Sequence, residues 1–157
     1  MSIRGFFTYW SRGDRMGGLW RLYGLRGRAR HRLTRDLWTL LLNRSARRHG
    51  GYLGPEAVIQ GRPVLPHGLH GVYISRYATI GPGCRIYQNV TIGEVGGKAP
   101  FIGPNCLIGA GAVIVGDIKV GAGAKIGAGA VVCQDIPEGC TVVAGPPRIL
   151  KRGDGHV

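Results

Sequence analysis

Two histidines, His67 and His70, are the residues of this sequence best suited to moving a proton. The imidazole titrates near neutral pH, so a histidine on an outward loop can act as a general base. A loop histidine taken alone is more often a surface residue, and the argument for chemistry rests on position. Both lie in PHGLHGVY, where a regular pattern in the chain is interrupted.

That pattern is an aliphatic residue at every sixth position between Ile74 and Val132. Six residues make about 1.67 turns of an α-helix, which would scatter these side chains around it, so a helix is excluded here. Six is an even multiple of the strand period, and the recurring glycine permits a corner, so each hexapeptide predicts a short strand and a turn. Fixed-period repeats of this kind indicate a solenoid, here a β-helix. The residues expected to point inward are Ile74, Ile80, Ile86, Ile92, Ile102, Ile108, Ile114, Val120, Ile126 and Val132, with Ala78, Cys84, Val90, Cys106, Ala112, Ile118, Ala124 and Ala130 four positions after them.

The period fails in two places. Three extra residues enter between Leu65 and Ile74, where the histidines lie, and four enter between Ile92 and Ile102, in GEVGGKAPF. A closely packed β-helix accommodates an insertion only where it loops outward, and insertions in solenoids commonly form the binding face. Both interruptions are therefore predicted site elements.

The coils from Ile108 to Ala130 are rich in glycine and alanine and would present a nearly bare backbone to an extended ligand. Small residues that simply make tight corners explain the same composition, and this alternative stays open. Basic residues suited to phosphate binding lie in or after these coils, although a charged tail is often only solvated. They are Lys125, Arg148, Lys151 and Arg152.

The four cysteines show no C-x-x-C pair and no histidine at zinc spacing, which argues against a metal site or a disulfide framework and favours a reduced, cytosolic setting. Cys84 and Cys106 occupy equivalent inward positions. We expect them to stack as small core residues on adjacent coils, about 4.8 Å apart.

The net charge of +13 is concentrated near the N-terminus, where residues 1–50 hold twelve arginines. Residues 1–32 read as a basic, aromatic arm, flexible or loosely docked, with a short helix allowed within 19–25. Its aromatics with interleaved arginines also fit an anionic membrane surface. Nucleic-acid binding is disfavoured because no recognised module surrounds them. The sequence predicts neither a membrane span nor a signal peptide.

Residues 33–50 predict an amphipathic helix with Leu33, Leu37, Leu40 and Leu41 on one face. We expect it to cap the open end of the solenoid or to pack on a partner subunit, in preference to lying on a membrane. The β-helix is expected over residues 52–142, and a C-terminal turn with a basic tail over 143–157. The predicted fold class is mainly β.

Taken together, LPHGLHGVYIS, IYQNVTIG, GGKAP, IGAGAVIVGDIKVGAGAKIGAGAVV and AGPPRILKR resemble the hexapeptide-repeat acetyltransferases, most closely the serine acetyltransferase-like branch, over residues 52–152. The resemblance implies a left-handed parallel β-helix and a homotrimer with active sites between subunits. It also implies acetyl-CoA as co-substrate. From the cysteine pattern we expect no metal and a cytoplasmic location. Peripheral contact of the arm with the inner membrane surface is left open.

The resemblance also assigns roles to residues. His67 matches the catalytic histidine, implied to take the proton of an acceptor hydroxyl as it attacks the acetyl thioester, and His70 is a second candidate. The remaining matches are to acetyl-CoA contacts. They are the backbones of Ala110 and Ala128 along the pantetheine arm, Lys125 beside it, Arg148, Lys151 and Arg152 near the nucleotide, and Gly96 and Gly97 in the loop that closes over the thioester.

Three departures from the family pattern affect the acceptor half of the site. Tyr52 stands where a carboxylate orients the catalytic histidine, Pro66 replaces a second carboxylate, and Ala99 replaces a histidine that helps hold serine. We therefore expect an O-acetyltransferase whose acceptor is a sugar or related glycoconjugate hydroxyl. The sequence does not decide what orients His67; the Tyr52 hydroxyl and Glu56 are the two candidates. The alternatives are a serine O-acetyltransferase of cysteine biosynthesis and a non-catalytic trimeric scaffold with membrane-binding arms. A γ-class carbonic anhydrase is disfavoured because the repeat region holds only two histidines.

Overall fold

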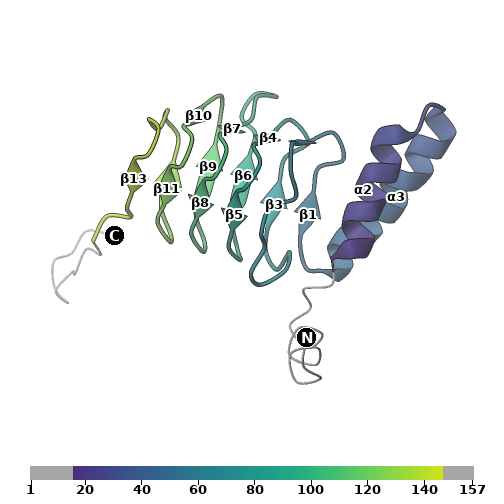
Figure 1. Cartoon of the computed structure of the whole chain (residues 1–157), viewed down its shortest axis with the longest axis horizontal. Coiled ribbons are helices and arrows are strands. Elements are labelled where there is room, and N and C mark those ends of the chain that lie inside the picture. Colours follow the sequence, from purple (N-terminus) through teal and green to yellow (C-terminus); the bar gives the residue numbers. More distant parts are fainter. Residues whose placement is uncertain (1–15, 147–157) are drawn as a thin grey trace, which may run out of the picture.

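The computed structural model of this chain describes residues 16–146. Two helices, α2 (Gly17–Arg28) and α3 (Arg32–Arg48), stand at one end of a column of short strands, and the described chain ends at the opposite end (Figure 1). The strands are β1 (Tyr52–Leu53), β2 (Val58–Ile59), β3 (Tyr73–Ile74), β4 (Thr79–Ile80), β5 (Arg85–Ile86), β6 (Thr91–Gly93), β7 (Phe101–Ile102), β8 (Leu107–Ile108), β9 (Val113–Val115), β10 (Lys119–Val120), β11 (Lys125–Ile126), β12 (Val131–Val132) and β13 (Thr141–Val142).

These strands form three parallel sheets, which we number 1 to 3. Sheet 1 has the order β1-β3-β6-β9-β12, sheet 2 the order β2-β4-β7-β10, and sheet 3 the order β5-β8-β11-β13. Ile74 pairs with Ile92, eighteen residues later, so three hexapeptides complete one coil around a three-sided prism. The predicted parallel β-helix is confirmed.

The two interruptions of the period leave the register intact. Ile92 pairs with Ile114, twenty-two residues later, and Leu53 pairs with Ile74, twenty-one residues later. The extra residues are taken up in outward loops because a shift along the strand would turn the inward side chains toward solvent.

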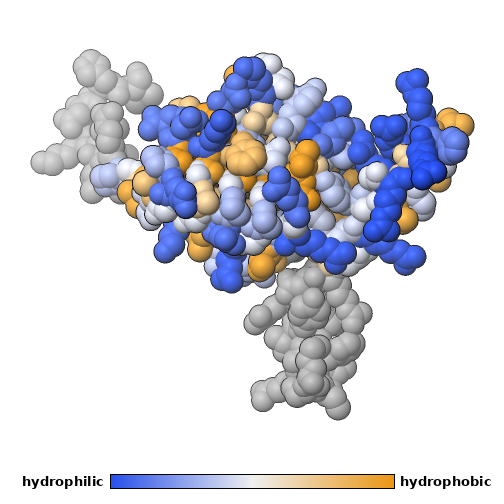
Figure 2. All heavy atoms as spheres, turned by 45° about the horizontal axis from the view of Figure 1, so that its top comes forward, coloured by the Kyte–Doolittle hydropathy of each residue, from blue (hydrophilic) through white to orange (hydrophobic). Residues whose placement is uncertain are grey.

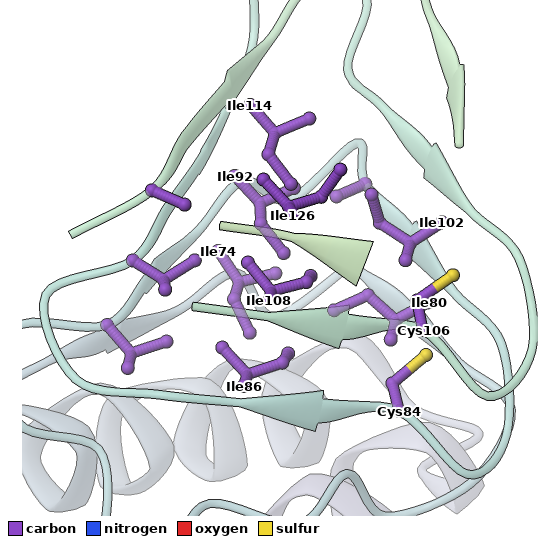
Figure 3. Packing of buried hydrophobic residues seen from close by; sticks show 14 of the residues in the cluster. Ile74, Ile80, Cys84, Ile86, Ile92, Ile102, Cys106, Ile108, Ile114 and Ile126 are labelled. Carbon is purple, nitrogen blue, oxygen red and sulfur yellow. The ribbon is translucent and has the colours of Figure 1, made fainter. Parts of the chain in front are cut away.

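The core is the predicted stack of aliphatic residues. Every residue expected to point inward is buried, and Figure 3 shows the isoleucines of successive coils packed in columns beside Cys84 and Cys106. The corner glycines permit close packing of the coils as well as turning. A Cβ added at Gly109 would lie 2.6 Å from the backbone nitrogen of Ala128 in the next coil.

The helix pair covers the N-terminal end of the β-helix. Leu42 and Ala46 of α3 and Leu19 of α2 are fully buried in the cluster that continues into the coils. In addition, Arg26 of α2 pairs with Glu56 of the first coil at 2.5 Å.

Two expectations for this region need correction. Residues 17–28 form the helix α2, so the expected flexible arm does not extend to residue 32. Packing supplies the reason, since Leu19 is buried and the hydroxyl of Tyr23 donates a hydrogen bond to the carbonyl of Ala57. The leucine stripe of α3 is also not the face that packs on the β-helix: Leu33, Leu37 and Leu40 are exposed. The arm residues 1–15 lie outside the described part of the chain.

Candidate active site

The loop that carries both histidines lies on one edge of the prism, where the chain passes from sheet 3 to sheet 1. We call this the histidine edge; it consists of residues 65–72, 87–90, 109–112 and 127–130. Its corners are stacked by backbone hydrogen bonds. These are Asn89 N to His70 O (3.0 Å), Gly111 N to Gln88 O (3.0 Å) and Gly129 N to Ala110 O (2.9 Å). The histidine loop is therefore in register with the Gly/Ala corners.

A hydrogen bond within the loop fixes the tautomer of one histidine. Nδ1 of His70 lies 2.7 Å from the carbonyl oxygen of His67. A carbonyl oxygen only accepts, so Nδ1 carries the proton and Nε2 of a neutral His70 keeps its lone pair. The same bond ties the two histidines together across the turn, and both side chains are exposed.

His67 lies beside Tyr87, with ring centroids 6.1 Å apart and a tilt of 49°. The predicted orienting groups are engaged elsewhere. Glu56 pairs with Arg26 at 2.5 Å and with Arg76 at 3.8 Å. A hydrogen bond with Tyr52 raises the pKa of the Arg76 guanidinium. Within residues 16–146 neither Tyr52 nor Glu56 hydrogen-bonds to His67 of the same chain.

The predicted pantetheine contacts share the histidine edge. Ala110 and Ala128 stand one above the other at its corners. The glycines that follow them, Gly111 and Gly129, have open space on their outer side, since an added Cβ would meet only the backbone nitrogen of Gly129 at 4.0 Å in the first case and nothing within 4 Å in the second. Lys125 is exposed on β11, the strand of sheet 3 that leads into this edge. The edge thus brings His67, His70, Ala110, Ala128 and Lys125 onto one side of the molecule.

The second predicted loop lies on a different edge, where the chain passes from sheet 1 to sheet 2. Val95 and Lys98 form an antiparallel bridge around Gly96 and Gly97, whose φ angles are +60° and +78°. Two positive φ angles in a two-residue turn are the geometry that glycine allows without strain. Within one chain the structure therefore does not bring Gly96 and Gly97 to the histidines.

Polar contacts support this hairpin on both sides. Lys98 donates to Asp117 at 2.6 Å, and that bond raises the pKa of the Lys98 ammonium. Ser75 donates to Glu94 at 2.8 Å. Lys98 is thus held by a neighbour in its own chain.

Two residues of the histidine edge were missed in the sequence. Tyr87 lies against His67, and the side-chain oxygen of Gln88 is buried without a hydrogen-bond partner in the described region. The repeat pattern could have revealed both residues, because Tyr87 and Gln88 align with Gly109 and Ala110 of the next coil. Large polar residues at corners otherwise made of glycine and alanine could have identified them.

Other predicted features stand apart from this edge. Cys84 and Cys106 are buried on adjacent coils, whereas Cys133 and Cys140 are exposed, and all four are free. Over residues 16–146 no group of three or more His, Cys, Asp or Glu side chains is gathered as for a metal ion. Neither described helix has the length and apolarity needed to cross a bilayer. Arg148, Lys151 and Arg152 lie outside the described residues.

Part of the repeat region matches a known family model. Residues 99–134 match the family model described as bacterial transferase hexapeptide (six repeats). This match agrees with the three-sided parallel β-helix of hexapeptide repeats that the structure shows.

Within that class, the chain is similar to serine acetyltransferases. It is 44% identical over 102 residues to the enzyme of Staphylococcus aureus, covering 62% of this chain and 47% of the relative. It is 38% identical over 97 residues to that of Synechococcus elongatus, covering 59% of this chain and 39% of the relative. The structure of Neisseria gonorrhoeae serine acetyltransferase in complex with serine superposes with a TM-score of 0.73 at 32% identity, over 83% of this chain and 55% of that one.

These findings confirm the resemblance to the serine acetyltransferase-like branch. The chain spans about half the length of the relatives it matches, or less.

Proposed function

We propose that this protein is an acetyl-CoA-dependent O-acetyltransferase in which His67 is the general base. The observation that carries the proposal is the histidine edge: a loop with two histidines stands in register with the small-residue corners at Ala110 and Ala128. This register supports a base and an extended thioester lying along one line of the molecule. The similarity to serine acetyltransferases supports the same reaction.

In the proposed reaction His67 accepts the proton of the acceptor hydroxyl. The oxygen attacks the thioester carbonyl of acetyl-CoA and forms the new C–O bond. The C–S bond then breaks, and the leaving thiolate takes a proton back from the imidazolium. His70, through its Nδ1–H to the His67 carbonyl, holds the loop that positions the base.

Acetyl-CoA is proposed to lie along the histidine edge. The backbone at Ala110 and Ala128 would hydrogen-bond to the amides of the pantetheine arm, and Lys125 would meet a phosphate. Arg148, Lys151 and Arg152 are proposed nucleotide contacts on the strength of the resemblance alone. No step of the reaction requires a metal in this scheme.

We further propose that the working unit is a homotrimer. Gly96 and Gly97 lie on a different edge from His67, so the hairpin of one chain cannot close over the thioester held by the same chain. In a threefold arrangement of three-sided prisms, one chain's hairpin edge can face its neighbour's histidine edge. Each active site would then contain parts of two subunits.

For the acceptor, we propose serine in the first place. The relatives that match are serine acetyltransferases, and one solved neighbour is a complex with serine, so the comparisons favour serine over the sugar hydroxyl expected from the sequence. A sugar or glycoconjugate hydroxyl stands as the second candidate. It is favoured by the uncharged residues Pro66 and Ala99, which stand where serine-recognising groups are expected, and by Tyr52 in place of the carboxylate that orients the histidine.

The test is an acceptor screen with purified protein and acetyl-CoA, following free thiol release over amino acids and sugars. Serine-dependent release that falls by about two to four orders of magnitude in His67→Ala is the expected result. His31→Ala is the matched control, because His31 is exposed and its side chain makes no capping hydrogen bond. Release with sugars alone would replace serine by the second candidate, and near-normal turnover by His67→Ala would refute the role of the base.

We also propose a cytoplasmic location, where acetyl-CoA is available. The N-terminal arm, residues 1–15, is proposed to contact the inner membrane surface peripherally, on the basis of its aromatics and arginines. Vesicle binding that survives removal of these residues unchanged would contradict the role of the arm.

A further inference from the structure

The outer face of α3 combines exposed leucines with exposed arginines along one line. Leu33, Leu37 and Leu40 have exposed fractions of 85%, 52% and 64%, and we call them the leucine patch. Arg44, Arg47 and Arg48 are also exposed, and we call them the arginine patch. At 100° per residue all six fall within one sector of the helix, opposite the buried Leu42.

The arginine patch borders a hollow. A cavity of about 500 Å³ is lined by Leu40, Asn43, Arg44, Arg47 and Arg48. The side-chain oxygen of Asn43 is buried there and has no hydrogen-bond partner among the described residues. The three ion pairs within residues 16–146 involve Arg26, Arg76 and Lys98, so the patch is not neutralised inside this chain.

We propose that this face of α3 binds an anionic membrane surface. Leucines beside arginines on one helical face suit the boundary between acyl chains and headgroups, where the apolar side chains enter the boundary and the cations meet lipid phosphates. Figure 2 shows hydrophilic side chains gathered over the helix-pair end of the molecule, with apolar side chains between them. The proposal concerns a folded helix and is independent of the arm and of the transferase activity.

The positive charge of the helix pair favours a lipid surface over a second copy of the chain as the partner of this face. Residues 17–48 hold nine arginines and one acidic residue, Asp36. Arg30 and Arg32 lie at one end of the leucine patch and the arginine patch at the other. Two copies packed leucine to leucine would therefore bring arginines beside arginines, whether the helices ran parallel or antiparallel. A negatively charged surface complements both ends.

The test is sedimentation of the full-length protein with vesicles, either of phosphatidylcholine alone or of equal parts phosphatidylcholine and phosphatidylglycerol. We expect binding to the anionic vesicles only, weakened by added salt. Replacing the whole arginine patch by glutamine should weaken binding about fivefold for each arginine, about a hundredfold in all. Replacing the whole leucine patch by glutamine should weaken it by at least about tenfold.

The matched control removes three exposed cations from the β-helix by Arg62→Gln, Arg85→Gln and Lys119→Gln. This variant should lose much less affinity than the arginine-patch variant, and all variants should keep acetyl transfer and their circular dichroism. Patch variants that sediment like the parent protein would overturn the proposal and leave the arm as the membrane contact. A leucine-patch variant that changes only the assembly mass in light scattering would instead identify the face as a contact between copies.

Discussion

The hydrogen bond between His70 and His67 gives the sharpest test of the active site. Nδ1 of His70 donates to the His67 carbonyl at 2.7 Å, and asparagine places an amide N–H close to where Nδ1 stands. His70→Asn can therefore keep the bond and remove Nε2, whereas His70→Ala removes both. A neutral hydrogen bond of this kind is worth about 1 kcal/mol, so its loss should lower the fraction of correctly placed loop about fivefold.

If His70 only positions the loop, His70→Ala should lower kcat/KM about fivefold and His70→Asn should restore most of it. His67→Ala should cost about two to four orders of magnitude. The assay is steady-state thiol release from acetyl-CoA, with thermal unfolding followed on each variant to establish that it is folded. A His70→Asn variant as inactive as His67→Ala would refute this assignment and show that Nε2 of His70 is itself required for the reaction.

Three further predictions concern the edge and the core. Gln88→Met should raise the free energy of unfolding by about 1 kcal/mol, because it removes a buried oxygen that has no hydrogen-bond partner among the described residues. It should also lower acetyl transfer, because Gln88 belongs to the histidine edge. Urea unfolding and thiol release measure the two effects, and lower stability would contradict the reasoning. Ile108→Ala should cost about 2–5 kcal/mol in the same unfolding measurement, since Ile108 is fully buried in the stack, whereas Leu33→Ala should change stability by less than about 0.5 kcal/mol. The hydrogen bond with Cys84, together with burial, raises the pKa of the Cys106 thiol above its usual 9.0. Above about pH 9 the unfolded chain therefore releases a proton that the folded chain keeps, so the free energy of unfolding should fall as the pH rises. Cys106→Ala should flatten that decline, and an identical slope would show that the thiol is not its source.

Much of the fold could be predicted because every coil of a β-helix repeats the same short residue pattern. A period of six, with an aliphatic residue and then a small residue four positions later, identifies the inward positions without knowledge of long-range contacts. All of them are buried, from Ile74 to Val132. The two breaks of period likewise identified the two outward loops, because a stacked coil cannot absorb extra residues in its walls.

The helical region was predicted less well, since it lacks such a repeated pattern. Tyr23 and Arg26 make α2 part of the structure through contacts with Ala57 and Glu56, about thirty residues away in the chain. Nothing in the glycine-rich local sequence predicts those contacts. For α3, the leucine pattern identified an apolar face but not which face would meet the β-helix.

The sequence by itself determined the coil, its inward residues, and the histidines and glycines at its interruptions, because these follow from periodicity along one short stretch. The tertiary structure decided how those parts are distributed around the prism. His67 and His70 stand over Ala110 and Ala128, while Gly96 and Gly97 lie on another edge. The physical reason is that eighteen residues close one coil, so the edge on which a residue falls depends on register and on the backbone bonds between coils. The partners of Glu56, and the solvent-exposed face of α3, were likewise fixed only when distant segments packed together.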